Sequence, residues 1–274
     1  MASIDLLAIG HVTRDRLDQG FTTGGTVTYG AATARALGLV PAIVTSAGPD
    51  LQSPLPDVNT HVVEAARSTA FRNDYGPSGR TQHVDGVAKA LSPPDVPGEW
   101  QGARSVLLGP LVGEVSVEFA RQFPNALVVA SLQGWLRRWD SDATGLVTPR
   151  GWSGLAVLPY IDAAVVSVDD IVDDDQVPQW AELVPLLVVT EGSRGARLHT
   201  EGRWHTIPVF AARELDPTGA GDVFAAALAL MLLETGEAVA AATFASCVAS
   251  FSVEAEGTSG LPTRAQVDER LATG

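Results

Sequence analysis

The residues best suited to chemistry form the run 214–222, ELDPTGAGD, which precedes a long stretch rich in alanine and leucine. Small residues at a helix start let a ligand approach the backbone, and the free N–H groups there bind anions. Asp222 falls in the first turn, where the helix dipole stabilises a negative charge. The run predicts an anion hole formed by Gly219, Ala220 and Gly221, beside a carboxylate that can take a proton from a hydroxyl group. The alternative is a capped helix without chemistry.

The elements that must position this run are short apolar strands alternating with helical segments. We expect strands at 4–10, 41–48, 105–109, 126–131, 163–168 and 186–192, helices at 27–38, 114–122 and 177–184, and a hairpin at 196–209 with a Glu201-Gly202 turn. Residues 219–254 are typical of two packed helices broken near Gly236, and a short helix follows Pro262. This alternation predicts an α/β fold, a three-layer α-β-α arrangement around a mainly parallel sheet, as one domain over residues 1–274.

Residues 68–88 do not fit the alternation. They alternate polar and apolar residues around a central Gly-Pro-Ser-Gly. That pattern indicates a half-exposed antiparallel hairpin. Because it is inserted between units of a parallel sheet, we expect a small β lid rather than a second core.

Composition excludes several classes of protein. The formal net charge is −14, so nucleic-acid binding is not expected, although a small phosphorylated ligand can still bind to local donors. The single cysteine, Cys247, cannot form an internal disulfide, and its apolar surroundings indicate a buried side chain. Apolar runs are too short for a membrane span, and the first residues do not resemble a signal peptide. These features lead us to expect a cytoplasmic protein without a membrane partner.

The stretch 214–224 resembles the C-terminal signature of the ribokinase-like carbohydrate kinases, of the phosphofructokinase-B type. Other segments resemble that family in the same order, so the resemblance covers nearly the whole chain. They are Gly10 with Asp15 five residues later, Gly24-Gly25 before a helix that ends at Leu37-Gly38, the lid residues Thr69, Arg80 and Gln82, and the loop Thr190–Gly195. The spacing of these motifs is most similar to that in a subgroup that includes plant inositol kinases.

The resemblance implies a role for each matching residue. Asp222 is the expected catalytic base. The donor nucleotide is expected at Thr190, Gly192, Gly195 and Thr218, and the acceptor at Asp15, Gly24, Gly25 and Tyr29. Asp216 and Thr218 match a loop that binds a monovalent cation in relatives, or they only shape the turn. The implied reaction transfers the γ-phosphoryl group of ATP, with Mg²⁺, to a hydroxyl of a small sugar or polyol.

Three departures from the family pattern bear on substrate and metal. Tyr29 stands where relatives carry a sugar-binding asparagine, and Thr26 replaces a lysine near the transferred phosphate. The Asn-x-x-Glu motif becomes Ser-Val-Asp-Asp at 167–170, in which Asp170 can still bind a metal-ligated water. Arg137 or Arg138 could supply the missing charge, because guanidinium binds phosphate oxygens bidentately.

Two rival functions stay open. A nucleoside kinase on the same fold would use Phe71, Tyr75 and Tyr29 around a base, and a silent nucleotide- or sugar-binding protein would have lost turnover. The Tyr29 side chain either faces the acceptor, which favours a cyclitol over ribose, or points into the core. We expect the protein to act as a monomer or a homodimer.

Overall fold

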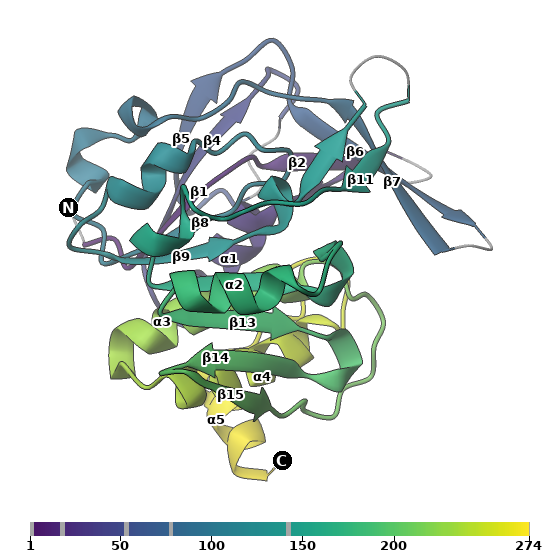
Figure 1. Ribbon diagram of the computed structural model, residues 1–274. Helices are drawn as coiled ribbons and strands as arrows, with labels where there is room; N and C mark the ends of the chain where they lie inside the picture. The colour runs from purple at the N-terminus through teal and green to yellow at the C-terminus, as the bar shows by residue number, and fades with distance from the viewer. Residues whose placement is uncertain (1–2, 17–19, 52–54, 77–78, 141–143, 274) are drawn as a thin grey trace.

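The computed structural model describes residues 3–16, 20–51, 55–76, 79–140 and 144–273. Within these residues, one sheet has nine strands in the order β15-β14-β13-β12-β9-β8-β1-β4-β5 (Figure 1). The strands are β1 (Leu6–Ile9), β4 (Pro41–Ala47), β5 (Asn59–Glu64), β8 (Ser105–Leu108), β9 (Leu127–Ser131), β12 (Ala163–Ser167), β13 (Leu186–Thr190), β14 (Ala196–Thr200) and β15 (Arg203–Ile207). Neighbours from β13 to β5 are parallel, whereas β14 runs antiparallel to both of its neighbours, β13 and β15. The predicted mainly parallel sheet is confirmed.

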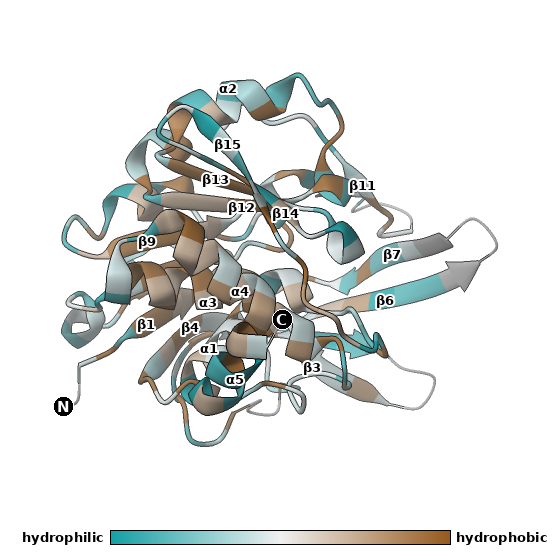
Figure 2. Cartoon of the chain, turned by 90° about the horizontal axis from the view of Figure 1, so that it is seen from below, coloured by the Kyte–Doolittle hydropathy of each residue, from teal (hydrophilic) through white to brown (hydrophobic). Residues whose placement is uncertain are grey.

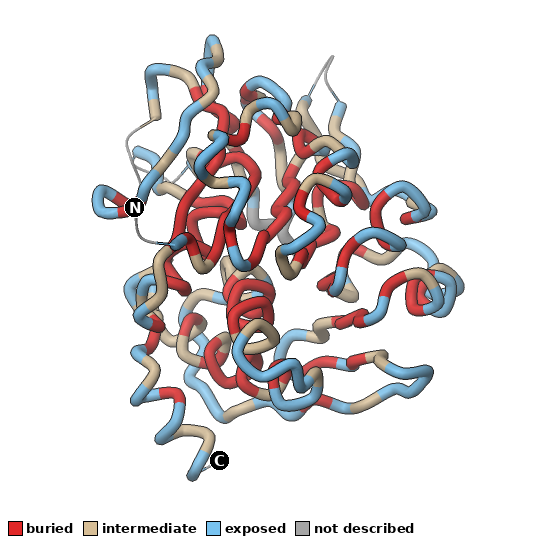
Figure 3. Tube along the Cα trace, turned by 90° about the vertical axis from the view of Figure 1, so that its left-hand side faces the viewer, coloured by how far each residue is buried: buried red, intermediate tan, exposed pale blue. Residues whose placement is uncertain are grey.

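Helices cover both faces of this sheet because successive strand residues point to opposite sides. On one face, Leu6 packs in a cluster with residues of α1 (Thr26–Ala36), α3 (Ala220–Thr235) and α4 (Ala238–Ser252). On the other face, Leu7 belongs to a cluster that also contains Trp180 of α2 (Gln176–Leu183). The last helix, α5 (Arg264–Thr273), lies against α4. The three-layer prediction is therefore confirmed, and buried residues follow the central segments of the trace in Figure 3.

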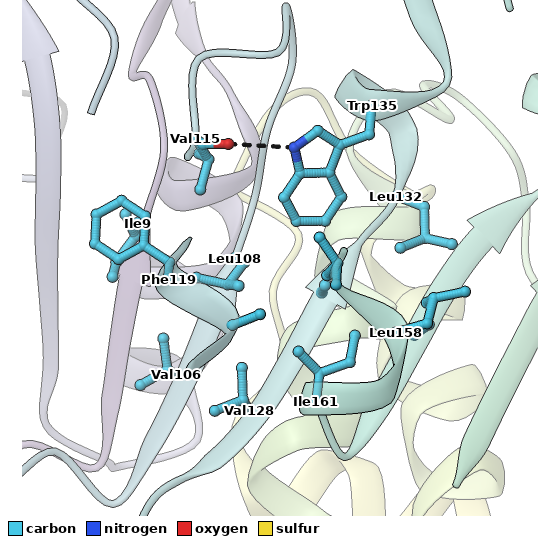
Figure 4. Packing of buried hydrophobic residues seen from close by; sticks show 14 of the residues in the cluster. Ile9, Val106, Leu108, Val115, Phe119, Val128, Leu132, Trp135, Leu158 and Ile161 are labelled. Carbon is cyan, nitrogen blue, oxygen red and sulfur yellow. Dashed lines mark hydrogen bonds between the residues drawn. The ribbon is translucent and has the colours of Figure 1, made fainter. Parts of the chain in front are cut away.

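The face opposite α3 is held by short 3-10 turns and tryptophan rings. Trp135 stacks on Trp152 with ring centroids 5.5 Å apart, and Trp152 meets Trp180 at 6.2 Å. The indole nitrogen of Trp135 donates to the carbonyl of Val115 at 3.2 Å, as Figure 4 shows beside Phe119 and Leu108. This packing fixes the chain just before Arg137.

A second sheet, which we call the lid sheet, has the order β3-β2-β6-β7. Its strands are β2 (Thr13–Arg16), β3 (Phe21–Gly24), β6 (Thr69–Gly76) and β7 (Gly79–Gly86). The β6–β7 pair is antiparallel, as the pattern of residues 68–88 predicts, and it projects from the main sheet with largely hydrophilic colouring (Figures 1 and 2). Pro77 and Ser78 of the Gly-Pro-Ser-Gly tip lie outside the described residues.

Half of the lid sheet, one further hairpin and the edge strand β5 are not predicted from the sequence. Strand β2 pairs with β3 and, in parallel, with β6. A small hairpin of β10 (Arg137–Trp139) and β11 (Val147–Pro149) lies next to β7, where the Val84 N–H donates to the carbonyl of Gly145 at 2.8 Å. The lid is therefore built from three separate parts of the chain.

The helix predicted at 114–122 was wrong. Only a 3-10 helix, Val117–Arg121, forms there. Val115 pairs with Leu91 as a β-bridge, and the Ser116 side chain caps the turn by accepting from the Glu118 N–H. The residues before 117 are thus held extended, and Pro124 follows too soon for a full helix.

The C-terminal half agrees closely with expectation. Strands β14 and β15 form the predicted hairpin around Glu201 and Gly202, both with positive φ. Helices α3 and α4 are separated at Gly236, and Cys247 is buried between α4 and the chain near Val267. Among the described residues, no helix is long and apolar enough to cross a membrane.

Candidate active site

The start of α3 lies against α1, which comes from the other end of the chain. Gly219 adopts a left-handed conformation, φ +80°, at the N-cap position of α3. The Tyr29 ring of α1 lies against it so closely that a Cβ at position 219 would be 2.4 Å from the ring. Glycine is required here by both the backbone angle and the ring.

Backbone donors at this helix start are open to a ligand. Ala220 N–H donates to the Pro217 carbonyl at 3.2 Å, and Thr218 N–H donates to the Asp216 carboxylate at 2.9 Å. Among the described residues, nothing accepts from the N–H groups of Gly221 and Asp222. Of the predicted anion hole, Gly221 is thus open and Ala220 is already engaged. The Asp216 bond supports the turn-shaping interpretation of residues 216–218.

Asp222 lies between groups from four other elements. Thr26 of α1 donates its hydroxyl hydrogen to Oδ1 of Asp222 at 2.7 Å. Burial is the main cause that raises the pKa of Asp222 to about 6, while the Thr26 bond and the positive charge of Arg137 lower it. The negative charges of Asp170 and Asp15 raise this pKa further. A partly exposed carboxylate with such a pKa is suited to act as a base near neutral pH.

Asp15, Gly24 and Gly25 come together at the root of the lid sheet. The Thr13 hydroxyl donates to Oδ1 of Asp15 at 3.0 Å, and a Cβ on Gly24 would be 2.4 Å from Oδ2 of the same carboxylate. Gly25 has φ +95°, and a Cβ there would be 2.3 Å from the carbonyl oxygen of His11. Glycine is thus required at position 25 by the backbone angle and the His11 carbonyl, whereas Gly24 leaves room for the Asp15 carboxylate.

Tyr29 is buried and belongs to the cluster under α3. Burial, with repulsion from Asp222, Asp216 and Asp15, raises the pKa of its phenol, which therefore stays neutral. The ring supports Gly219 from below. This agrees with the interpretation of Tyr29 as a core residue, so its size alone carries no argument about the acceptor.

Arg137 connects the core to the lid sheet. Its Nε donates to Oδ1 of Asp170 at 2.8 Å, and its Nη2 is 2.6 Å from the same oxygen. Its Nη1 donates to the side-chain oxygen of Gln82 on β7 at 3.2 Å. With its amide oxygen turned toward the guanidinium, Gln133 accepts from Nη2 at 2.8 Å. One cation thus joins β10, the loop after β12, and the lid.

The choice between Arg137 and Arg138 follows from strand alternation. Arg138 points the other way, is exposed, and donates from Nε to the hydroxyl of Thr148 at 3.2 Å. Of these two arginines, only Arg137 affects the pKa of the Asp222 carboxyl. Arg137 is therefore the arginine at the site.

The residues expected to contact the nucleotide lie at the end of β13. Thr190 pairs in register with Ser167, so it neighbours the loop that carries Asp170. Gly192 is exposed with open space around it. Gly195 is buried, has φ +92°, and its Cβ would be 2.5 Å from the Ile207 carbonyl, which gives it a structural role in the turn. A donor contact at these positions stays a prediction.

The described residues hold no group of three or more histidine, cysteine, aspartate or glutamate side chains able to bind a metal. A magnesium ion in phosphoryl transfer needs only one or two carboxylates besides the donor phosphates. The buried Asp170 provides one such carboxylate, although it is paired with Arg137. The donor set thus fits an ion held mainly by the phosphates.

Two residues of the site were not expected to act there. Thr26 was noted only as a lysine replacement, and its bond to Asp222 spans 196 positions. The buried Glu114 accepts from the N–H groups of His11, Leu111 and Val112, and so holds the loops after β1 and β8 together. No local pattern indicates the Thr26–Asp222 bond or the contact of Glu114 with His11.

Comparisons with known proteins point to one family of kinases. Residues 163–264 match the pfkB family of carbohydrate kinases. The chain is 42% identical to the ribokinase of Bacillus subtilis over 87 residues, which are 31% of this chain and 30% of that protein. It is 30% identical to the inositol 3-kinase of Arabidopsis thaliana over 183 residues, 63% of this chain and 50% of that protein. The predicted relationship to the ribokinase-like kinases is confirmed.

A solved structure shares the fold over nearly the full length. It is a pyrophosphate-dependent kinase in the ribokinase family, complexed with a pyrophosphate analog and myo-inositol. The TM-score is 0.78 at 20% identity, over 97% of this chain and 99% of that one. The sequence matches cover 30% of the length of the ribokinase and 50% of the length of the inositol 3-kinase.

Proposed function

We propose that this ribokinase-like chain transfers the γ-phosphoryl group of ATP to a hydroxyl of a small sugar or polyol, with Asp222 as the base. The observation that carries the proposal is the pairing of a partly buried carboxylate with open backbone donors at the start of α3. Asp222 has a pKa of about 6, and the adjacent Gly221 N–H has no acceptor among the described residues.

The residues divide the work between acceptor and phosphoryl group. Asp222, ionised above pH 6, takes the proton of the acceptor hydroxyl as that oxygen attacks phosphorus. The charge that develops on the transferred group rests on the N–H groups of Gly221 and Asp222. Asp15 accepts hydrogen bonds from other acceptor hydroxyls, which a carboxylate can do twice or more. Arg137 supplies positive charge on the lid side.

A divalent ion supplies charge neutralisation to the donor phosphates in this chemistry. Asp170 would hold the ion through a bound water, and Thr190 and Thr218 would face the donor. The Arg137–Asp170 pair lies where the donor phosphates are expected, so these phosphates compete with Asp170 for the guanidinium group. This arrangement lets Arg137 move to the phosphate oxygens when the donor arrives.

The acceptor class follows from what surrounds Asp15. Phe71 is buried against Val84 and Leu111, and Tyr29 supports Gly219, so neither ring offers a free face to a nucleoside base. The inositol 3-kinase relationship and the carboxylate of Asp15 both support a polyhydroxylated ring. A cyclitol is therefore our first candidate acceptor, ahead of ribose and nucleosides.

The decisive experiment is a panel assay of product formation with purified protein. Acceptors are myo-inositol, ribose, fructose and adenosine, each tested with ATP and separately with pyrophosphate, and the phosphorylated acceptor is detected by mass spectrometry. We expect turnover with ATP, highest for the cyclitol. Turnover with pyrophosphate but not with ATP would overturn the assignment of ATP as the donor. The highest kcat/KM on ribose would overturn the cyclitol as the acceptor. No turnover with any acceptor and either donor would favour a catalytically silent binding protein.

A further inference from the structure

Thr26 is held in one orientation by its surroundings. It is fully buried in the first turn of α1, directly after Gly25. Gly109, which follows β8, lies so close that a Cβ there would be 2.6 Å from both Cβ and Cγ2 of Thr26. The methyl side of Thr26 therefore faces Gly109. Threonine is already stiff about its first side-chain torsion, so this packing directs the hydroxyl to Asp222.

The hydroxyl makes one short bond, from Oγ1 to Oδ1 of Asp222 at 2.7 Å. A hydroxyl carries a single donor hydrogen, and an ionised carboxylate only accepts. The bond therefore fixes which carboxylate oxygen is occupied by the protein. It also ties α1 to α3, two helices that meet only in the folded chain.

We propose that Thr26 is a positioning residue for Asp222, which holds Oδ1 and orients Oδ2 as the oxygen that receives the acceptor proton. This inference rests on the proposed kinase function for its kinetic consequences. The bond itself concerns the free protein and can be tested without any substrate. A buried threonine placed only for packing would need no partner at Oδ1.

The bond also favours the ionised form of the base, because it is made to the charged oxygen. The charged and titratable groups that act on Asp222 or are affected by it are Arg137 from β10, Asp170 after β12, Asp15 from β2 and Tyr29 from α1. Among the causes that lower the pKa of Asp222, the Thr26 bond ranks before Arg137. Its removal should therefore move the protonation of Asp222 to higher pH.

The test compares three substitutions of Thr26 with a matched control. Thr26→Val keeps the shape and removes the donor, Thr26→Ala removes both, and Thr26→Ser keeps the donor. The control is Thr33→Val, because Thr33 is equally buried on the same helix and donates to the Tyr29 carbonyl at 2.8 Å. The pKa of Asp222 is measured in the free protein by carbon NMR of its carboxyl group, and the pH profile of kcat/KM is measured on the active acceptor.

We expect Thr26→Val and Thr26→Ala to raise the carboxyl pKa and the kinetic midpoint together by about one pH unit. On the high-pH plateau, kcat should fall roughly tenfold with a smaller change in KM, since an oriented base acts in the transition state. Thr26→Ser should keep the wild-type midpoint, and Thr33→Val should move neither quantity.

An unchanged carboxyl pKa in the folded Thr26→Val or Thr26→Ala protein would overturn the inference. So would a midpoint shift in Thr26→Ser as large as that in Thr26→Ala. If the wild type phosphorylates nothing, the proposed function fails, and the NMR titration still decides whether Thr26 controls Asp222.

Discussion

Replacing Asp222 with asparagine should remove activity and stabilise the protein at the same time. Asparagine keeps the shape and an oxygen that can accept from Thr26, and it removes the charge. Loss of a general base lowers turnover by roughly 10²–10⁴. Stability should rise instead, because burial makes the ionised carboxylate of Asp222 unfavourable in the folded protein, and asparagine has no charge.

The size of that cost follows from the pKa. Burial raises the pKa of Asp222 from 3.8 to about 6 in the folded protein. The protein is therefore most stable when Asp222 is protonated, at a pH below the pKa of this group in the unfolded chain. It loses stability as the pH rises from there to the pKa of Asp222 in the folded protein. A shift of about two units corresponds to at most ~3 kcal/mol, and partial exposure lowers this to about 1–2 kcal/mol. At pH 8 the variant should unfold roughly 2–8 °C above the wild type. At pH 5 the gap should be about half as large.

The assay pairs turnover at pH 8 with calorimetric unfolding at pH 8 and pH 5. Glu237→Gln is the control, since Glu237 is an exposed acid at the start of α4 and lies outside the site. Its stability should change by less than about 0.5 kcal/mol and its turnover should not change. Wild-type turnover in Asp222→Asn would refute the base assignment. An equal or lower unfolding temperature at pH 8 would refute the argument that burial raises the pKa.

Three further outcomes are expected. Backbone hydrogen exchange in residues 69–86 should slow when donor and acceptor bind together, and unchanged exchange in the ternary complex would argue against a closing lid. Arg137→Met should lower turnover roughly 10- to 1,000-fold, whereas the outward-facing Arg138→Met should stay near wild type in the same assay. Gly195→Ala should destabilise the protein by more than about 1 kcal/mol in urea unfolding, because alanine meets both φ +92° and the Ile207 carbonyl; an unchanged midpoint would contradict the structural role of this glycine.

Elements that bury a regular apolar pattern were predictable from the sequence. Apart from the edge strand β5, the parallel strands are mainly runs of Val, Leu, Ile and Ala buried on both faces, and α3 begins after Gly219 and ends before Gly236, two glycines that the sequence marks. The lid strands β2 and β3 carry no such pattern. They are four residues long and mostly polar, and they exist because β2 pairs with β6, more than 50 positions away. Pairing over that distance leaves no local signal.

The site shows the same division. Asp222 and its glycines form a continuous motif, so a local pattern together with the family resemblance is enough to predict them. Thr26, Gln82 and the choice of Arg137 over Arg138 depend on which side chains meet after folding. The core position of Tyr29 depends likewise on the close contact with Gly219. The donor-side residues Thr190 and Gly192, the cytoplasmic location and the oligomeric state stay predictions.

The position of Asp15 has a consequence for how acceptor preference can change. Asp15 lies on β2, within the lid sheet, whereas Asp222 begins a helix of the core. Under the proposed function, acceptor recognition and proton transfer therefore belong to different structural units, which are joined through Arg137 and the start of α1. Exchange of the lid strands for those of a relative should therefore carry the relative's acceptor preference with them. The phosphoryl-transfer machinery on α3 would be inherited unchanged, which makes this architecture a modular one.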